Sequence, residues 1–127
     1  MDEPSGFTVE AGRAVYRPSV SVTFDEAVAL VRAAIAAACA KQARELLVDT
    51  TALTGFSSPN TFQRFLAAVG WAEEASGRLR LSMVARPEMI DPQKFGVTVA
   101  TNRGLTCNIF PTVAEASAWL DARRTGG

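Results

Sequence analysis

The feature that most constrains the fold is a short apolar run, Leu46-Leu47-Val48, in which no polar residue alternates with the apolar ones. A strand with one face in water alternates apolar and polar side chains, whereas a strand covered on both faces does not. The run therefore predicts a central strand with other elements packed on both faces. A polar loop, Asp49 to Ser58, follows it, and Pro59 predicts a helix start with Ser58 as N-cap.

Four segments carry the pattern of amphipathic helices. Two of them begin with the three-residue spacing of a capping box, Thr23 with Glu26 and Thr112 with Glu115. Asp91-Pro92 repeats the N-cap and proline pattern of the second helix. Apolar residues at steps of three and four mark the expected buried faces: Phe24, Val28, Val31, Ile35 and Cys39 in the first helix, Phe62, Phe65, Leu66 and Val69 in the second, Phe95 and Val99 in the third, and Val113, Ala116 and Leu120 in the fourth.

The remaining segments predict strands. Residues 6–10 and 14–16 indicate an opening hairpin around Ala11-Gly12, residues 78–83 alternate as in a strand toward a sheet edge, and residues 106–110 form the last strand. The order ββαβαβαβα predicts an α/β fold with right-handed crossovers. We expect a single domain over residues 1–127 with loose ends at 1–5 and 125–127. Its mixed, mostly parallel sheet should have about five strands and four helices around it.

The charge balance bears on partners and location. Thirteen basic residues match thirteen acidic ones, so the chain lacks the basic footprint expected of a nucleic-acid or anionic-membrane binder. The longest apolar stretch, residues 28–40, contains Arg32 and is shorter than the roughly 20 residues of a membrane span. Residues 1–6 lack the pattern of a signal peptide. We expect a cytoplasmic protein with no transmembrane segment and no nucleic-acid partner.

The residue types available for chemistry are few. The chain has no histidine, which removes the usual imidazole base and the commonest metal ligand. Cys39 and Cys107 lie far apart without a C-x-x-C pairing, so they indicate neither a disulfide framework nor a zinc site. We expect no metal, no cofactor and no enzymatic activity, with both cysteines acting as small hydrophobic residues.

Leu47-Val48-Asp49 runs into a Gly/Ser-rich loop that caps a helix, and this order of elements resembles the STAS domain of anti-sigma-factor antagonists. Residues 46–66 carry the resemblance most clearly. Residues 114–120 are similar to the closing helix of the related bacterial sporulation-antagonist-like group. The resemblance implies a regulatory, partner-switching module with a phosphorylated serine at the position of Ser57 or Ser58. Here no aspartate precedes Ser57, and Pro59 stands in place of the family's glycine.

Each candidate site has an ordinary alternative. Ser57 and Ser58 are phosphoacceptor candidates or simply helix-capping residues. Trp71 is expected opposite the apolar face of its helix, as an anchor for a partner or second copy, unless a loop covers it. Two further sets complete the candidates: an interaction loop of Asp49, Thr50, Thr51, Gly55 and Phe56, which are alternatively turn residues, and anion or ligand contacts of Arg86, Lys94 and Arg103, which are alternatively solvated surface charges.

Two functional hypotheses follow from these candidates. The first is a non-catalytic interaction module of STAS type, in which residues 55–58 and the adjoining helix contact a protein partner and Trp71 supports a homodimer. The second is a carrier of a small apolar or anionic ligand, of lipid type by family implication, bound between the loops at residues 49–58 and 86–91.

Overall fold

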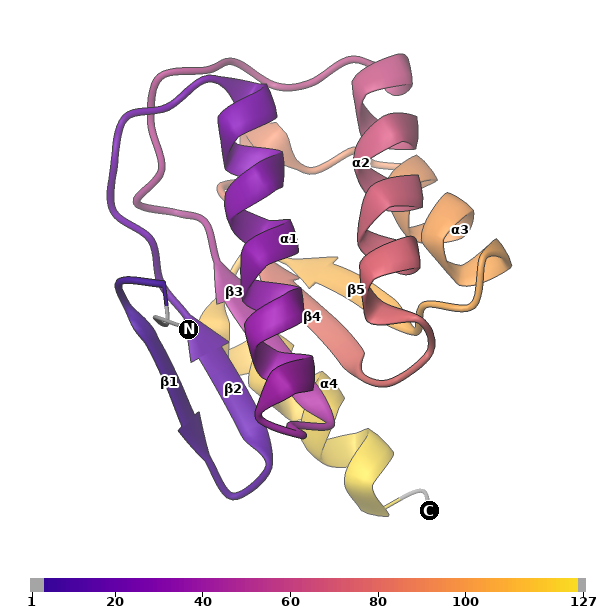
Figure 1. Cartoon of the computed structure of the whole chain (residues 1–127). Coiled ribbons are helices and arrows are strands. Elements are labelled where there is room, and N and C mark those ends of the chain that lie inside the picture. The colour runs from indigo at the N-terminus through magenta and orange to yellow at the C-terminus, as the bar shows by residue number, and fades with distance from the viewer. Residues whose placement is uncertain (1–3, 126–127) are drawn as a thin grey trace.

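The computed structural model describes residues 4–125, and the predicted α/β fold is confirmed. Of the ends expected to be loose, residues 1–3 and 126–127 lie outside the described residues. Figure 1 shows the elements in chain order: β1 (Phe7–Glu10), β2 (Arg13–Tyr16), α1 (Phe24–Ala40), β3 (Glu45–Asp49), α2 (Thr61–Ala75), β4 (Arg80–Val84), the 3-10 turn η1 (Pro87–Met89), α3 (Phe95–Asn102), β5 (Cys107–Phe110) and α4 (Val113–Thr125).

The five strands lie side by side in the order of the sequence, β1-β2-β3-β4-β5. β1 and β2 are antiparallel and the later pairs are parallel, as the sequence predicted. The hairpin turns at Ala11 and Gly12, whose φ angles of 51° and 81° belong to a left-handed turn that fits the twist of paired strands.

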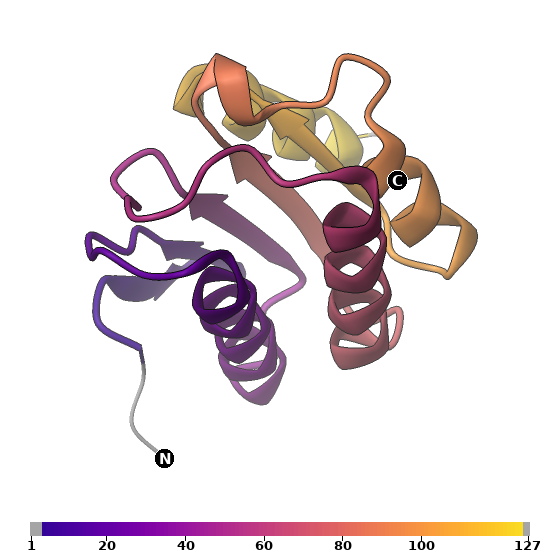
Figure 2. The same cartoon turned by 90° about the horizontal axis from the view of Figure 1, so that it is seen from above.

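The sheet separates two layers of helices (Figure 2). α1, α2 and α3 each connect two neighbouring parallel strands with the same hand, so all three cover one face of the sheet. α4 follows the last strand and covers the other face. Side chains that alternate along β3 divide the core accordingly: Leu46 and Val48 pack under α1 to α3, and Leu47 packs under α4. The unbroken apolar run therefore does mark a strand buried on both faces.

The expected edge position of β4 is wrong. β4 lies between β3 and β5, and Ser82, which with Arg78 and Arg80 suggested a less covered face, is 0% exposed. The Ser82 hydroxyl donates to the carbonyl of Ala116 in α4 at 3.0 Å, which satisfies it inside the core. β5 is the edge strand on this side of the sheet.

The expected buried face of α2 is also wrong. Phe62 is 68% exposed and Leu66 is 54% exposed. The inward face consists of small residues and of Trp71, which packs against the larger core. The buried residues of α2 are Ala67, Ala68, Ala72 and Ala75.

Two helices begin later than their sequence patterns suggested. Asn60, and not Ser58, caps α2, and it forms a reciprocal capping box with Gln63. α3 begins at Phe95, and Asp91 reaches forward so that its carboxylate accepts from the Phe95 N–H at 2.8 Å. Among residues 4–125, no helix combines the length and the hydrophobicity needed to cross a membrane.

Candidate ligand pocket

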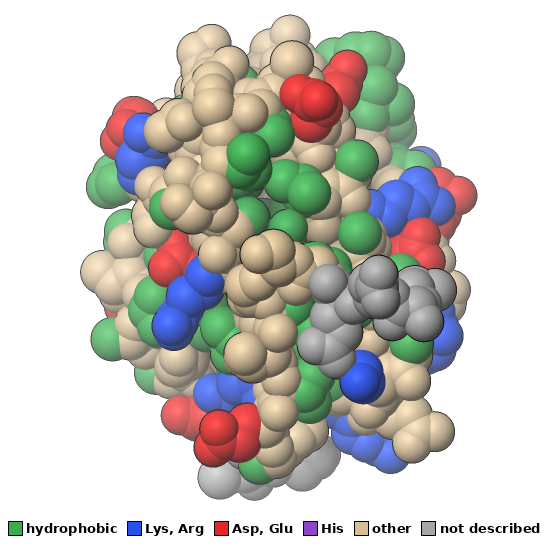
Figure 3. Space-filling view, turned by 60° about the vertical axis from the view of Figure 1, so that its left-hand side comes forward, with side chains coloured by type: hydrophobic (Ala, Val, Ile, Leu, Met, Phe, Trp, Pro, Cys, Tyr) green, Lys and Arg blue, Asp and Glu red, His purple; other side chains and the backbone are tan. Residues whose placement is uncertain are grey.

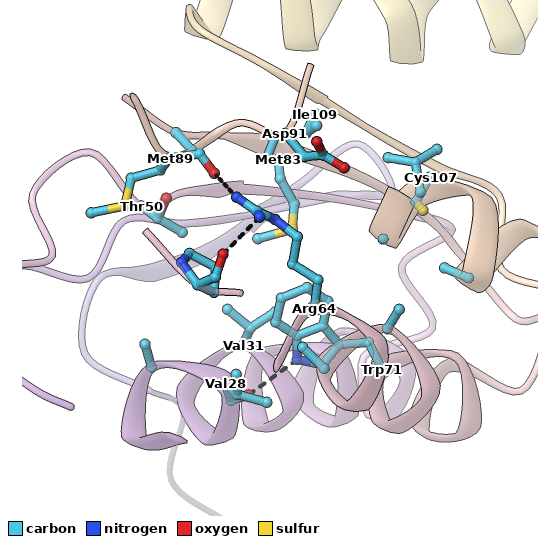
Figure 4. Close-up of a pocket in the computed structure, with 18 of the residues that line it drawn as sticks. Val28, Val31, Thr50, Arg64, Trp71, Met83, Met89, Asp91, Cys107 and Ile109 are labelled. Carbon is cyan, nitrogen blue, oxygen red and sulfur yellow. Dashed lines mark hydrogen bonds between the residues drawn. The ribbon is translucent and has the colours of Figure 1, made fainter. Parts of the chain in front are cut away.

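A largely apolar pocket of about 150 Å³ lies between the sheet and the layer of α1, α2 and α3. Residues 50–59 and 85–94, which follow β3 and β4, border it at the carboxyl edge of the sheet. This is the place between two loops where the ligand hypothesis put a crevice. Figure 4 shows the side chains of several elements converging on it.

Small residues on the surrounding helices leave this space open. Ala27 of α1, Ala67 and Ala68 of α2, and Gly96 and Ala100 of α3 all line the pocket. Two methionines, Met83 and Met89, also line it, and their flexible thioether chains adapt readily to differently shaped apolar molecules. The pocket is therefore a product of side-chain size, in a layer that is otherwise closely packed.

Trp71 forms part of the pocket wall instead of projecting from the protein. Its indole Nε1–H donates to the carbonyl oxygen of Val28 in α1 at 3.1 Å, and this bond links the two helices (Figure 4). The prediction of an outward-pointing tryptophan is wrong, because α2 turns its alanine face and not its phenylalanines toward the core. The proposed homodimer contact through Trp71 thereby loses its basis.

Arg64 ties together the two loops at the pocket mouth. Its guanidinium donates to the Pro59 carbonyl at 2.7 Å, to Ser58 Oγ at 3.1 Å and to the Met89 carbonyl at 3.1 Å. Sequence reasoning missed this residue. Its position four residues after the cap Asn60 was visible, but its bond to Met89 depends on a segment 25 residues away.

Arg86 and Lys94 also line the pocket, as the ligand hypothesis required of them. Arg86 Nη2 approaches the Leu53 carbonyl at 3.4 Å, while its buried Nε has no hydrogen-bond partner in the part of the chain that the structure describes. Lys94 Nζ donates to Asn108 Oδ1 at 2.7 Å and lies 5.0 Å from the centre of the Phe110 ring.

The third predicted contact, Arg103, lies elsewhere. It follows the C-terminal end of α3, outside the lining of the pocket, and its guanidinium lies 5.7 Å from the centre of the Phe65 ring. The prediction placed it with Arg86 and Lys94 because all three flank one segment of sequence, but α3 carries it away from the mouth.

The charges at the mouth are unequal. Asp91 is the one carboxylate among the described lining residues, against the cations Arg64, Arg86 and Lys94. The backbone N–H of Phe95 holds the pKa of Asp91 below its usual range, with help from the N–H of Gln93 and from Arg64. Acidic and basic side chains are interspersed over the face shown in Figure 3.

Of the residues predicted to interact in the loop after β3, some form local contacts within the protein and others line the pocket. Asp49 Oδ1 accepts hydrogen bonds from the N–H and the hydroxyl of Thr51 at 3.0 and 2.7 Å. These two bonds form a local turn, which agrees with the alternative that these are turn residues. Thr50 and Phe56 line the pocket, and Phe56 packs edge-on against Phe24 with ring centres 5.8 Å apart. Gly55 fits closely against the segment before α1.

Ser57 and Ser58 are both exposed on this loop. Neither caps α2, since Asn60 does, so the capping alternative for the pair is wrong. The Ser58 hydroxyl oxygen accepts from Arg64, which makes it part of the mouth.

The two cysteines lack the surroundings of nucleophiles. Burial raises the pKa of the Cys107 thiol to about 11, and it also raises the pKa of Cys39. Cys107 lines the pocket as a small apolar group. In the part of the chain that the structure describes, no three His, Cys, Asp or Glu side chains gather as metal ligands.

The chain matches no protein-family model, and no curated protein and no solved structure is detectably similar to it.

Proposed function

We propose that this protein binds a small, mainly apolar molecule in the pocket between α1, α2 and α3, and acts as a carrier or sensor of that molecule. The observation that carries the proposal is the pocket itself: about 150 Å³ lined by alanine, valine, methionine and tryptophan side chains, with charged groups only at its mouth. Ligand sites in proteins typically combine such apolar walls with a few polar groups that fix orientation.

The volume indicates the size of the bound part. A cavity of about 150 Å³ lined by apolar side chains accommodates a molecule the size of benzene. An apolar body of about six carbons therefore fits inside, and any longer or polar part extends through the mouth. The proposal includes no catalytic step, since the chain has no histidine and burial keeps the Cys107 thiol protonated.

Titration with 1-hexanol tests the proposal. Trp71 lines the pocket, whereas Trp119 belongs to α4 on the other face of the sheet, so a Trp119→Phe background makes the fluorescence specific to the pocket. We expect a saturable change in Trp71 fluorescence and a rise in melting temperature, because a ligand that binds only the folded state stabilises it.

Variants that fill the pocket provide the contrast. Ala67→Leu and Val97→Phe place larger side chains in its wall and should abolish the response, whereas Ala118→Leu on the exposed side of α4 should preserve it. Circular dichroism of each variant establishes that it is folded. A response to 1-hexanol that is equal in filled and control variants, or absent from the wild type, would refute the proposal.

A second candidate function is binding of a protein partner through α2. The observation in its favour is the exposed pair Phe62 and Leu66, one helical turn apart and near the exposed loop at residues 55–58. A STAS-type regulatory role in a bacterial cytoplasm, with Ser57 or Ser58 phosphorylated, belongs to this candidate.

Light scattering during size exclusion tests the homodimer form of the second candidate. If Phe62 and Leu66 join two copies of the chain, the wild type should have a dimeric mass and the double variant Phe62→Gln/Leu66→Gln a monomeric one. A monomeric mass for both chains removes the homodimer.

A further inference from the structure

We infer that the ligand of the pocket is an anionic amphiphile, a short-chain carboxylate whose apolar body lies among α1, α2 and α3 and whose carboxylate pairs with Arg86. This inference rests on the proposed function and names the chemical class of its ligand. It commits to a head group that is negatively charged, and it assigns the main contact to one residue.

The apolar interior of the pocket leaves only the mouth for a polar group of the ligand. The interior of the pocket is formed by apolar side chains, and an ionised group there would lose its hydration without gaining partners. Arg86, Asp91 and Lys94 belong to the segment after β4, which borders the pocket at the carboxyl edge of the sheet. Arg64, the other charged lining residue, lies in the first turn of α2 and donates to carbonyls of both bordering segments. A head group is therefore bound at the mouth while the hydrocarbon part faces inward.

The three cations at the mouth differ in the hydrogen bonds that they already make. Arg64 already donates to three oxygen acceptors, and Lys94 is held by Asn108 at 2.7 Å. Arg86 differs: among the described residues its buried Nε has no hydrogen-bond partner, and the one hydrogen bond of its guanidinium, from Nη2 to the Leu53 carbonyl, is long at 3.4 Å. A buried N–H without a hydrogen-bond partner is costly, so a small turn of the Arg86 side chain that brings this N–H to an acceptor is favoured.

The geometry of the Arg86 guanidinium determines which acceptor fits it. The Nε–H and one Nη–H of an arginine form a fork that matches the two oxygens of a carboxylate, and such paired bonds are stronger than those to neutral acceptors. Glu88 does not fill this place. Its carboxylate lies 3.8 Å from Arg86 Nε, beyond hydrogen-bond distance, and it is 64% exposed to solvent.

The side chains at the pocket mouth carry a net positive charge. The lining residues Arg64, Arg86 and Lys94 outnumber Asp91 by two positive charges, and Glu88 beside Arg86 reduces that excess to one. The pKa of Asp91 is lowered, so its carboxylate is charged at neutral pH and is already included in this balance. The mouth thus attracts anions and repels cations, which excludes amines of the same size as ligands.

A comparison of hexanoate with hexanamide tests the inference, since the two probes differ in charge but hardly in shape. We expect hexanoate to bind the wild type at least tenfold more tightly at pH 7.5, an advantage of the size measured for charge-assisted hydrogen bonds. The readout is Trp71 fluorescence in the Trp119→Phe background, checked by titration calorimetry.

Arg86→Gln should reduce the preference for hexanoate to near parity and leave the affinity for hexanamide unchanged. The matched control is Arg17→Gln, which removes an exposed arginine outside the pocket lining and should preserve the preference. If Arg86→Gln does not fold, Arg86→Lys retains the charge without the fork and should lower the preference only in part.

The outcomes separate the inference from the proposed function. Equal binding of hexanoate and hexanamide, or a preference that survives in Arg86→Gln, overturns the anionic ligand while the pocket still binds 1-hexanol. Failure of 1-hexanol, hexanoate and hexanamide alike overturns the proposed function and the inference together.

Discussion

Gly55 occupies a place in the loop after β3 that no other residue type fits. Its φ angle is +103°, in the region that favours glycine, and a Cβ atom there would lie 2.4 Å from the carbonyl oxygen of Val22. The neighbouring bonds explain the closeness: the Val22 N–H donates to the Thr54 carbonyl at 2.8 Å, and the Thr54 N–H donates to Val20. These two hydrogen bonds hold residues 20–22 against residues 54–55, and this contact anchors the loop that borders the pocket.

Replacing Gly55 separates two costs of adding a methyl group. Gly55→Ala has both the unfavourable φ and the clash with Val22, whereas Gly77→Ala has a φ of +71° and nothing within 4 Å of the new atom. We expect Gly77→Ala to lower the free energy of unfolding by about 1–2 kcal/mol. Gly55→Ala should lower it by roughly 3 kcal/mol or more, since the backbone must also move. Urea unfolding of both variants measures the difference. Equal losses of unfolding free energy in the two variants would show that Gly55 and Val22 are not tightly packed.

At the scale of the elements, local patterns were enough to predict the order of helices and strands, the hairpin at Ala11-Gly12 and the central position of β3. Each of these depends on residues close together in sequence. The loops that border the pocket were also predicted, together with Arg86 and Lys94. The strand order was not predicted, because it depends on pairings between distant segments.

The faces of α2 were predicted the wrong way round for a physical reason. Large apolar residues usually mark the buried side of a helix, and Phe62, Phe65, Leu66 and Val69 form such a stripe. In this fold α2 packs against the alanine-rich α1 and against α3, where small side chains allow close approach. The pocket lies in the same layer, so its alanine wall and Arg64 could not be found from hydrophobicity alone.

Substitutions on α2 test this assignment of faces. Phe62→Gln and Leu66→Gln should each change the free energy of unfolding by no more than about 0.5 kcal/mol, as exposed sites do. Ala72→Gln should cost roughly 3 kcal/mol, because Ala72 is 5% exposed and a longer polar side chain would be forced into the contact with the core. Thermal unfolding compares the three variants. A larger loss of stability in Leu66→Gln than in Ala72→Gln would mean that the face predicted from the sequence, and not the alanine face, is the buried one.

Across the whole molecule, the two edges of the sheet have different roles. Arg13, Glu45 and Arg80 are the first residues of β2, β3 and β4, and they lie in register across the amino edge. Glu45 is 1% exposed and accepts from Arg13 and from Arg80, each at 3.0 Å, while Arg13 also reaches Asp121 of α4 at 2.7 Å. This network connects three strands and a helix, whereas the carboxyl edge is left open around the apolar pocket.

Stability and ligand binding should therefore respond to different substitutions. Glu45→Gln removes the buried charge that both arginines share, and breaking such a pair should lower the free energy of unfolding by roughly 3 kcal/mol. The affinity for 1-hexanol should be unchanged, because Glu45 lies outside the pocket lining at the opposite edge of the sheet. Glu10→Gln, which removes the same charge from an exposed position on β1, should change neither quantity. Urea unfolding and Trp71 fluorescence measure the two quantities on the same samples. If Glu45→Gln weakened 1-hexanol binding as strongly as the pocket-filling Ala67→Leu does, the edges would be coupled and this division of roles would be wrong.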